Sequence, residues 1–390
     1  MTLKQGRPAT SRSRQQRWST RSRRQGEGRD MSTDGHRSPA AVAEGQQFGC
    51  QVGAVDPVEL FHRYQRAGFL YPAKRDRLAP YWSSVLDTWR RSLEAGEQLH
   101  YLVTGRSPDE MGWASLSVWR TTLHGWQVQH LVSSGGGDGA RAVLSTAIRA
   151  QQRRATNAFF QSWFRPQNPF ADALFGTVPQ TLGPQQAVVQ DFQYLALPLS
   201  RADQAAARWR LTECRPTDAA ALAELTRRIR GPLYTSCEDL DRGDLGLAAL
   251  DERYRVVGLR RYRRAWLAHG PGSTPVGAAL AHRGPLGLNL SFLENRCDLL
   301  ITPDLPRAHR VEVAAALCRA VRPAYLDFPP AFIPITTDVG TADFLERLGA
   351  RPLQRYAQCI WRQSGLTDLY RHVDAFYRHG GLPTRHPSSS

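Results

Sequence analysis

Residues 126–152 read WQVQHLVSSGGGDGARAVLSTAIRAQQ, and this stretch decides the fold. Trp126, Val128, His130 and Val132 alternate with three other residues, which is the period-two pattern of a strand with one well-buried face. Four glycines then fall within residues 135–139, where they allow backbone angles and close approaches that a Cβ would block. The stretch therefore predicts a strand that runs into a glycine-rich bend.

The residues after the bend predict a helix. Apolar residues recur at spacings of three and four and form one stripe: Ala140, Val143, Leu144, Ala147 and Ile148. The first N–H groups of a helix lack intrahelical acceptors and lie at the positive end of its dipole. A helix start beside a glycine bend is thus a candidate site for a diphosphate. A plain surface turn between any strand and any helix is the alternative interpretation.

Composition bounds the class of protein. At 390 residues the chain is long enough for two domains and a tail. No apolar run approaches the 18 residues that a membrane span needs, and the start lacks the apolar stretch of a secretory signal. The six cysteines form no CxxC pair and no zinc-type spacing, which favours a reducing compartment. We expect a soluble, cytoplasmic protein without a bound metal.

Positive charge is concentrated at the start of the chain. The net charge is +16, and Met1–Asp30 contains nine Lys/Arg against two Asp/Glu. Residues 1–50 are predicted to be a disordered basic tail, because they have too few large apolar residues to offset the cost of ordering. The tail could contact nucleic acid through phosphates. It could also be merely solubilising, or residues 1–30 could be untranslated, since Met31 opens a sequence that itself resembles an N-terminus.

The elements of the first 200 residues follow a recognisable order. Asp56 followed by Pro57 predicts a helix N-cap with proline at the first helical position. From there the pattern predicts, in order, a helix, a second helix at 80–94, strands at 99–103, 113–119 and 126–132, the bend and its helix, a strand at 158–164, a short helix at 168–175 and a strand at 188–197.

The same order begins again further along the chain. A helix is capped by residues 215–218, and the following strands, helices and terminal helix are expected at 265–268, 276–281, 297–301, 310–321, 332–336, 341–348, 355–361 and 366–377. The interval from Gly105 to Gly112 equals that from Gly270 to Gly277. The repeated order and spacing indicate an internal duplication.

This order resembles the acyl-CoA-binding core of the GNAT N-acyltransferase superfamily, whose fingerprint Q/R-x-x-G-x-G/A lies between a strand and a helix. Ser134, Gly137 and Gly139 occupy the three fingerprint positions, so two of three match. The segment from Thr341 to Gly349 is similar to the family's A-x-x-F-Y-E-K-L-G-F segment. The resemblance implies an α/β (α+β mixed sheet) fold in two tandem domains, 54–200 and 208–363, followed by a C-terminal helix and tail at 364–390.

The resemblance also implies a function: transfer of an acetyl or other acyl group from acyl-CoA, as co-substrate, to an unidentified amine. The residues that it assigns to acyl-CoA are Val132, Ser134, Gly135, Gly136, Gly137, Asp138, Gly139 and Ala140. The family holds the pantetheine arm where the strand before this bend separates from its neighbour. The second copy has Arg310 and Glu312 in place of the fingerprint glycines, so we expect it to be degenerate, unless Arg307 and Arg310 bind phosphate directly.

Two residues are candidate bases for the chemistry. His130 precedes the bend, and Glu294 lies near the central strand of the second copy. A core or rim histidine and an exposed turn carboxylate are the alternative interpretations. The family's usual tyrosine is missing, because Leu174, Phe175 and Leu345 stand in the matching regions.

Two rival functions remain open at this point. The chain could be a GNAT-shaped scaffold or regulatory protein without catalysis, as the missing tyrosine suggests. It could also be a nucleic-acid-associated protein that works through its basic tail. No membrane partner is expected.

Overall fold

The computed structural model describes residues 48–53, 55–134, 136–153, 157–201, 209–270 and 274–378. The predicted basic tail, residues 1–50, lies outside the described residues except at its end, where Gly49–Gly53 forms a first strand, β1. The predicted C-terminal tail beyond residue 378 lies outside them as well.

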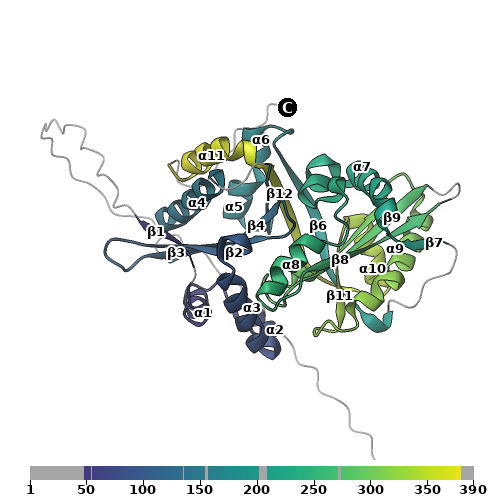
Figure 1. Cartoon of the computed structure of the whole chain (residues 1–390), viewed down its shortest axis with the longest axis horizontal. Helices are drawn as coiled ribbons and strands as arrows, with labels where there is room; N and C mark the ends of the chain where they lie inside the picture. The colour runs from purple at the N-terminus through teal and green to yellow at the C-terminus, as the bar shows by residue number, and fades with distance from the viewer. Residues whose placement is uncertain are drawn as a thin grey trace, which may run out of the picture. The chain divides into compact units, whose positions relative to one another are not determined.

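The strands form one mixed sheet of 12 strands in the order β1-β2-β3-β4-β5-β12-β6-β11-β10-β9-β8-β7 (Figure 1). Their bounds after β1 are β2 His100–Arg106, β3 Trp113–Arg120, β4 Gly125–Ser133, β5 Phe159–Phe164, β6 Ala187–Pro198, β7 Arg210–Glu213, β8 Tyr262–His269, β9 Pro275–Arg283, β10 Cys297–Ile301, β11 Phe332–Thr337 and β12 Arg351–Arg362.

The two halves of the chain, residues 49–198 and 210–362, have the same strand order. In the first half β1 to β4 pair antiparallel in sequence order, β4 pairs parallel with β5, and β5 pairs antiparallel with β12. In the second half β7 to β10 pair antiparallel in order, β10 pairs parallel with β11, and β11 pairs antiparallel with β6. The repeated order predicted from the sequence is therefore present in the sheet.

The last strand of each half is exchanged. β6 ends the first half but pairs with β11 of the second, and β12 ends the second half but pairs with β5 of the first. The two exchanged strands also pair with each other. A division at residues 200 and 208 thus separates the halves by sequence, while the sheet runs through both without a break.

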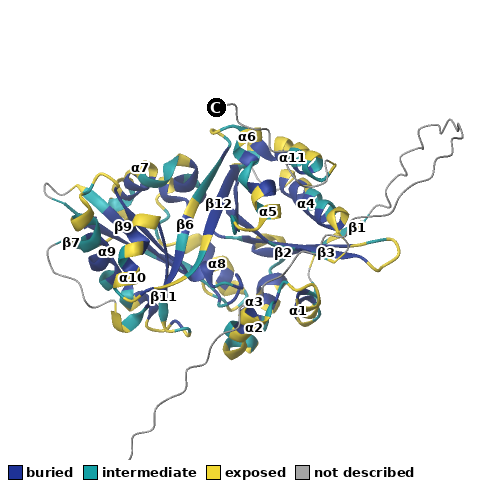
Figure 2. Cartoon of the chain, turned by 180° about the vertical axis from the view of Figure 1, so that it is seen from behind, coloured by how far each residue is buried: buried dark blue, intermediate teal, exposed yellow. Residues whose placement is uncertain are grey.

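Helices cover both faces of this sheet (Figures 1 and 2). Their bounds are α1 Pro57–Arg66, α2 Pro72–Leu78, α3 Trp82–Glu94, α4 Gly137–Gln152, α5 Pro169–Ala171, α6 Val178–Leu182, α7 Ala219–Cys237, α8 Ala248–Val256, α9 Arg307–Val321, α10 Val339–Arg347 and α11 Leu366–Arg378.

Alternation along the strands supplies a hydrophobic core on each face. Neighbouring residues Leu102 and Val103 of β2 belong to different cores. The first of these cores includes α1 and α3 and continues under α9 and α10 of the second half. On the opposite face, α4 and α11 cover the first half and α7 covers the second.

The predicted helix ends have the expected physical causes. The Asp56 carboxylate accepts a hydrogen bond from the N–H of Val58 at 3.1 Å, with Pro57 as the first helical residue. The Asp218 carboxylate accepts one from the N–H of Arg215 at 2.8 Å. Gly349 follows α10 with φ of +95°, which suits a residue without a Cβ.

Other elements differ from the sequence prediction. β1, α2 and α8 were not expected, because their apolar patterns are too short to stand out. The helix expected at 310–321 begins at Arg307, and the short helix expected at 168–175 continues through a π-helical turn into α6. Within the described residues, no helix combines the length and apolar character needed to span a membrane.

Candidate active site

β4 and β5 separate before either strand ends. Their parallel pairing stops at Val128 and Ser162, although β4 continues to Ser133 and β5 to Phe164. Beyond this point the facing strand edges do not pair with each other. Their backbone N–H and C=O groups are therefore available to a ligand that lies between them.

A β-bulge lies at the same level of β4. Leu116 of β3 faces two residues of β4, His130 and Leu131, because the register shifts between Ser115 and Ser117. His130 has φ of +55°, a conformation that is uncommon for residues other than glycine. The bulge turns the backbone of β4 just beyond the end of its pairing with β5.

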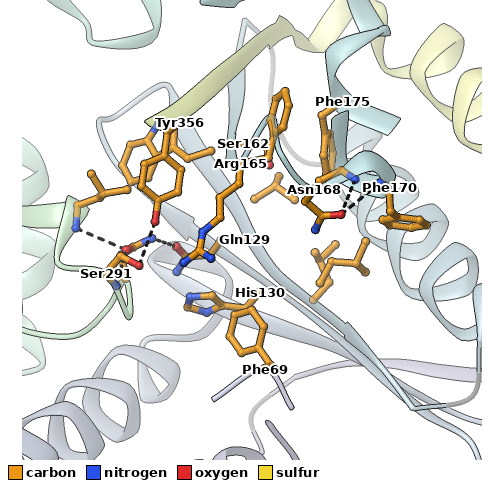
Figure 3. A pocket seen from close by; sticks show the side chains of 18 of the residues that line it. Phe69, Gln129, His130, Ser162, Arg165, Asn168, Phe170, Phe175, Ser291 and Tyr356 are labelled. Atoms are coloured by element: carbon orange, nitrogen blue, oxygen red, sulfur yellow. Dashed lines mark hydrogen bonds between the residues drawn. The ribbon is translucent and has the colours of Figure 1, made fainter. Parts of the chain in front are cut away.

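A cavity of about 330 Å³ lies against the bulge, a size at the lower end of small-molecule sites (Figure 3). Its walls come from the α1–α2 segment, from β4, from β5 and the residues after it, from the β9–β10 loop and from β12. The polar side chains among its lining residues are Tyr71, Lys74, Gln129, His130, Ser162, Arg165, Asn168, Asn289, Ser291 and Tyr356.

His130 lines this cavity within an aromatic shell. Its ring stacks on Trp89 with centroids 5.5 Å apart and meets Phe69 edge-on at 5.4 Å. Its Nδ1 atom is buried without a hydrogen-bond partner among the described residues. Desolvation lowers the His130 pKa well below its usual range, and the positive charge of Lys74 lowers it further. The imidazole is therefore neutral near pH 7 and able to accept a hydrogen bond or a proton.

Two cations enter the cavity from other elements. Lys74 on α2 is only 7% exposed, with Nζ 3.9 Å from the centroid of the Phe69 ring. Desolvation and the nearby Arg165 and Arg77 lower its pKa from 10.5 to about 7. Arg165, just after β5, donates a hydrogen bond to the Tyr71 hydroxyl at 2.8 Å. In the described part of the chain, no carboxylate lies within ion-pair distance of Lys74 or Arg165.

The second half forms one wall of the cavity. Gln129 of β4 accepts a hydrogen bond from the Asn289 side chain at 2.7 Å and donates one to the Leu288 carbonyl at 2.9 Å. The Tyr356 hydroxyl of β12 donates to the Ser291 hydroxyl at 3.3 Å. Figure 3 shows Ser291 and Tyr356 on the side of the cavity opposite Asn168 and Phe170. The cavity therefore requires both halves.

The glycine bend leaves the start of α4 exposed. Gly136, Gly137 and Asp138 are exposed, and no side chain caps the helix. Gly136 has φ of +82°, which explains the glycine at that position. The Asp138 carboxylate favours the helix start electrostatically but opposes an anion bound there.

The other residues assigned to acyl-CoA have different surroundings. Val132 is buried, and the Ser134 hydroxyl accepts a hydrogen bond from the N–H of Trp113 at 3.0 Å, which ties the bend to β3. Gly135 lies outside the described residues.

Gly139 and Ala140 are buried against the sheet. A Cβ on Gly139 would lie 2.9 Å from the Phe48 ring and 3.0 Å from the Ala114 methyl group, so this position needs glycine for packing. The spacing of the fingerprint glycines therefore has a structural cause that is separate from phosphate binding.

The C-terminal helix α11 lies along α4. Arg141 pairs with Asp374, and Arg149 donates a hydrogen bond to the Tyr370 hydroxyl at 2.6 Å. These α4 arginines thus hold α11 in place. A Cβ on Gly137 would lie 3.3 Å from the Tyr377 ring, so α11 ends beside the start of α4.

Comparison with known proteins yields distant structural likeness only. No family model matches the sequence, and no curated protein matches it. A GCN5-related N-acetyltransferase from Sphaerobacter thermophilus is 15% identical with a TM-score of 0.37, covering 80% of this chain and 96% of that one.

Two further solved structures are similar at the same level. A GCN5-related N-acetyltransferase from Kribbella flavida is 11% identical, with a TM-score of 0.30, and the match covers 80% of this chain and 71% of that protein's chain. Saccharomyces cerevisiae N-myristoyltransferase with bound myristoyl-CoA is 11% identical, with a TM-score of 0.34 and coverage of 81% and 78%. All three scores are low, so the assignment of the fold rests on the strand order and on the separation of β4 from β5.

The two halves have the strand order that the resemblance to the GNAT superfamily implies, and they are therefore called the first and the second GNAT copy. Each copy has the antiparallel strands, the parallel pair and the intervening helix at the places where the sequence resemblance put them. The separation of the parallel pair in the first GNAT copy is the opening that the resemblance predicted beside Ser134.

The second GNAT copy has a different opening. β10 and β11 pair only at Cys297 and Asp298, and the Thr337 hydroxyl then bridges them by donating to the Leu299 carbonyl at 3.1 Å. The register between β9 and β10 is continuous, so β10 carries no bulge. A cavity of about 280 Å³ adjoins this separation, and its charged lining residues are Asp191, Arg230, Asp298 and Asp338. Each of these three carboxylates has an arginine partner: Asp191 pairs with Arg355, Asp298 with Arg296 and Asp338 with Arg310.

The residues that replace the glycines in the second GNAT copy have partners within the protein. Arg310 pairs with Asp338 at 2.9 Å, and Glu312 accepts a hydrogen bond from the Trp209 indole at 3.0 Å. Arg307 is exposed. Arg310 and Glu312 are thus engaged with other side chains, whereas the start of α9, like that of α4, has no side-chain cap.

Glu294, the second candidate base, is fully buried, which excludes the alternative interpretation as an exposed turn carboxylate. Its side chain accepts a hydrogen bond from the N–H of Gly287 at 2.6 Å, and desolvation raises its pKa to about 8. It is not among the residues that line the cavity of the first copy. The loop that carries it does reach that cavity, through Asn289, Ser291 and Leu293.

Sequence reasoning missed most of the cavity. Lys74 and Arg165 are ordinary members of an Arg- and Lys-rich surface in the sequence, and only their burial beside one another sets them apart. Asn289 and Tyr356 come from the other half of the chain, so no local spacing could have linked them to His130.

Proposed function

We propose that the first GNAT copy transfers an acyl group from acyl-CoA to an amine. The observation that carries this proposal is the coincidence of three features at one level of β4: the end of its pairing with β5, the bulge at His130 and the adjoining cavity. A strand pair that separates beside a bulge offers unpaired backbone N–H groups in a site from which much of the water is excluded. Such groups polarise a carbonyl more strongly there than in water.

The residues present fit an acyl-CoA molecule at this site. The edges of β4 and β5 beyond Val128 and Ser162 would hold the pantetheine arm through backbone hydrogen bonds. The exposed N–H groups at the start of α4, from Gly137 onwards, would face the diphosphate. Bound in this way, acyl-CoA supplies the activated thioester carbonyl, and all other steps fall to the protein.

His130 is the proposed acceptor of the proton that the amine loses. As the bond from nitrogen to the carbonyl carbon forms and the carbon–sulfur bond breaks, the nitrogen becomes strongly acidic. A base whose pKa has been lowered by burial can therefore take the proton. The rings of Phe69 and Trp89, which pack against the His130 ring, fix its position for this role.

The missing tyrosine is compatible with this chemistry. An ordinary thiol has a pKa of about 8.5, so a thiolate can leave and take its proton from solvent afterwards. Asn168 occupies the start of the short helix instead, where its Oδ1 accepts hydrogen bonds from the N–H groups of Phe170 and Ala171. Its Nδ2 atom is the donor that it offers to the cavity.

The second GNAT copy is proposed to shape the acceptor side of the site. It contributes Asn289, Ser291 and Tyr356 to the cavity, while its own opening is bridged by Thr337. Domain boundaries at 54–200 and 208–363, an origin by internal duplication and a cytoplasmic location belong to the same proposal.

Acetyl-CoA binding and CoA release test this function. A ligand present at a hundred times its Kd should stabilise the protein by about 2.7 kcal/mol, which a thermal unfolding experiment detects. CoA release should then be measured by a thiol reagent with a panel of amines. Stabilisation without CoA release would favour a regulatory protein that binds CoA, and no stabilisation would favour a scaffold.

A charge change at the start of α4 sharpens this test. Asp138→Asn should tighten acetyl-CoA binding severalfold by removing a repulsive charge, while it lowers unfolding stability by about 0.3–1 kcal/mol through the helix dipole. Asp343→Asn, at an exposed position on α10, is the matched control and should leave acetyl-CoA affinity unchanged. An unchanged affinity in Asp138→Asn would remove the start of α4 from the proposed site.

A further inference from the structure

The charges around the cavity are unbalanced. Lys74 and Arg165 line it, and Arg77 lies close enough to lower the pKa of Lys74. The lining residues that the structure describes include no aspartate or glutamate. Elsewhere in the described chain many arginines have carboxylate partners, such as Arg141 with Asp374 and Arg310 with Asp338.

The two lining cations flank one tyrosine. The Lys74 Nζ atom lies 5.4 Å from the centroid of the Tyr71 ring, and the Arg165 guanidinium carbon lies 5.6 Å from the same centroid. The Arg165 guanidinium donates a hydrogen bond to the Tyr71 hydroxyl and also interacts with the Tyr356 hydroxyl, so its partners among these lining residues are neutral hydroxyl groups. Figure 3 shows the Arg165 side chain directed into the cavity.

Burying a cation without a counter-ion is unfavourable, and the lowered pKa of Lys74 reflects this. An anion placed between Lys74 and Arg165 would relieve the imbalance. A guanidinium has five N–H donors, so one whose protein partners are neutral hydroxyls can still bind a carboxylate through a two-pronged fork, and an ammonium adds a point charge.

We propose that the amine acceptor also carries a carboxylate, as a free amino acid does, and that Arg165 and Lys74 hold this carboxylate. This inference rests on the proposed acyl transfer for its amine but not for its anion. With the carboxylate held by these two cations, the amine would extend along Phe69 toward His130, whose ring lies 5.4 Å from the Phe69 ring.

The walls set the size of the acceptor and the character of its side chain. Phe69, Phe164, Trp163 and Tyr356 make much of the lining aromatic, and the volume of about 330 Å³ must also hold the end of the acyl group. A small acceptor with an apolar or aromatic side chain fits these walls better than a folded protein surface does.

The test uses matched pairs of ligands on the full-length protein. Each pair consists of an amino acid and the amine left after loss of its carboxylate: phenylalanine with phenethylamine, tryptophan with tryptamine, and lysine with cadaverine. Binding is measured by thermal shift without acyl-CoA, and turnover by CoA release with acetyl-CoA. At least one amino acid should exceed its amine by about 10- to 100-fold in affinity and in kcat/KM, as expected for a hydrogen bond to a charged group.

Arg165→Gln should abolish the preference within each pair, whereas Arg149→Gln, on α4 outside the cavity, should preserve it. Circular dichroism and thermal unfolding of both variants establish that the fold is retained. Equal response to both members of every pair would overturn the inference, as would a preference that survives in Arg165→Gln. A larger thermal shift or faster CoA release with phosphoethanolamine than with any amino acid would indicate that the site binds a phosphate, and this result would also overturn the inference.

The two proposals fail in different ways. Arg165-dependent binding of amino acids without CoA release would uphold the anion site and remove the acyl transfer. If kcat/KM for CoA release is as high with the decarboxylated amines as with the amino acids, the acyl transfer is upheld and the anion site is not.

Discussion

The two parallel strand pairs of this sheet have the same topology and different openings. In the first half the strands separate after Val128 and Ser162, beside a bulge and a cavity lined by cations. In the second half they separate after Asp298 and Thr336, and the next residue, Thr337, bridges the gap to the Leu299 carbonyl. At the position that matches Thr337, the first half has Trp163, whose side chain lines the cavity.

The difference shows how few residues separate an open site from a bridged one. Both halves keep the strand order because it depends on many apolar contacts spread over the sheet. The opening depends on single positions. The first half has the bulge at His130, the indole of Trp163 and two fingerprint glycines, whereas the second half has a continuous β10, the hydroxyl of Thr337, and Arg310 and Glu312 in place of the glycines. Topology is therefore shared between the halves, while the capacity to bind acyl-CoA is proposed for one of them.

The largest expected effect concerns the histidine at the bulge. His130→Asn should lower kcat for acetyl transfer by about 100-fold, because it removes the proposed proton acceptor. Asparagine tolerates a positive φ better than most residues, so the bulge should persist. Acetyl-CoA affinity should remain unchanged when measured by calorimetry. His309→Ala, at the start of α9, is the control in the second half and should keep kcat within about twofold; equal losses in both variants would erase the distinction between the halves.

Opposite pH dependence of stability is expected from one buried group in each half. Burial raises the Glu294 pKa from 4.5 to about 8, so stability is fully present below pH 4.5 and is lost as pH rises toward 8. Burial lowers the Lys74 pKa from 10.5 to about 7, so the unfolded state binds more protons between these values and stability rises with pH from 7 toward 10. Each effect is on the order of a few kcal/mol.

Urea unfolding of Glu294→Gln and Lys74→Met between pH 5 and 10 separates the two effects. Relative to the wild type, Glu294→Gln should gain stability as pH rises from 5 to 8, since glutamine retains an acceptor for the N–H of Gly287. Lys74→Met should show its largest gain at pH 7 and below, and the gain should shrink toward pH 10. A constant difference across this range in either variant would show that the group titrates normally in the folded protein.

The smallest effect tests the bridge in the second half. Thr337→Val should lower unfolding stability by about 1 kcal/mol, because the Leu299 carbonyl loses its donor. Thr337→Ser retains the hydroxyl and should recover most of this loss. Acetyl-CoA affinity should be the same in both variants. Tighter binding in Thr337→Val would mean that the bridge had been blocking a second site.

The sequence determined the repeated unit. Alternation at Trp126–Val132, the glycines after it and the apolar stripe from Ala140 predicted β4, the bend and α4, because strand and helix periodicity are local properties. Capping by Asp56 and Asp218 and the C-terminal Gly349 were equally local. These signals were enough to predict two copies of one mixed-sheet fold.

Only the tertiary structure decided how the copies combine and what surrounds the site. The exchange of β6 and β12 depends on pairing between residues more than 130 positions apart, which no local pattern encodes. The approach of Asn289 to Gln129 arises from packing between the halves, and the burial of Lys74 and Glu294 also depends on contacts between separate elements. Periodicity fixes which face of an element is apolar, but the partner of that face, and the cavity left between partners, are set by contacts across the whole sheet.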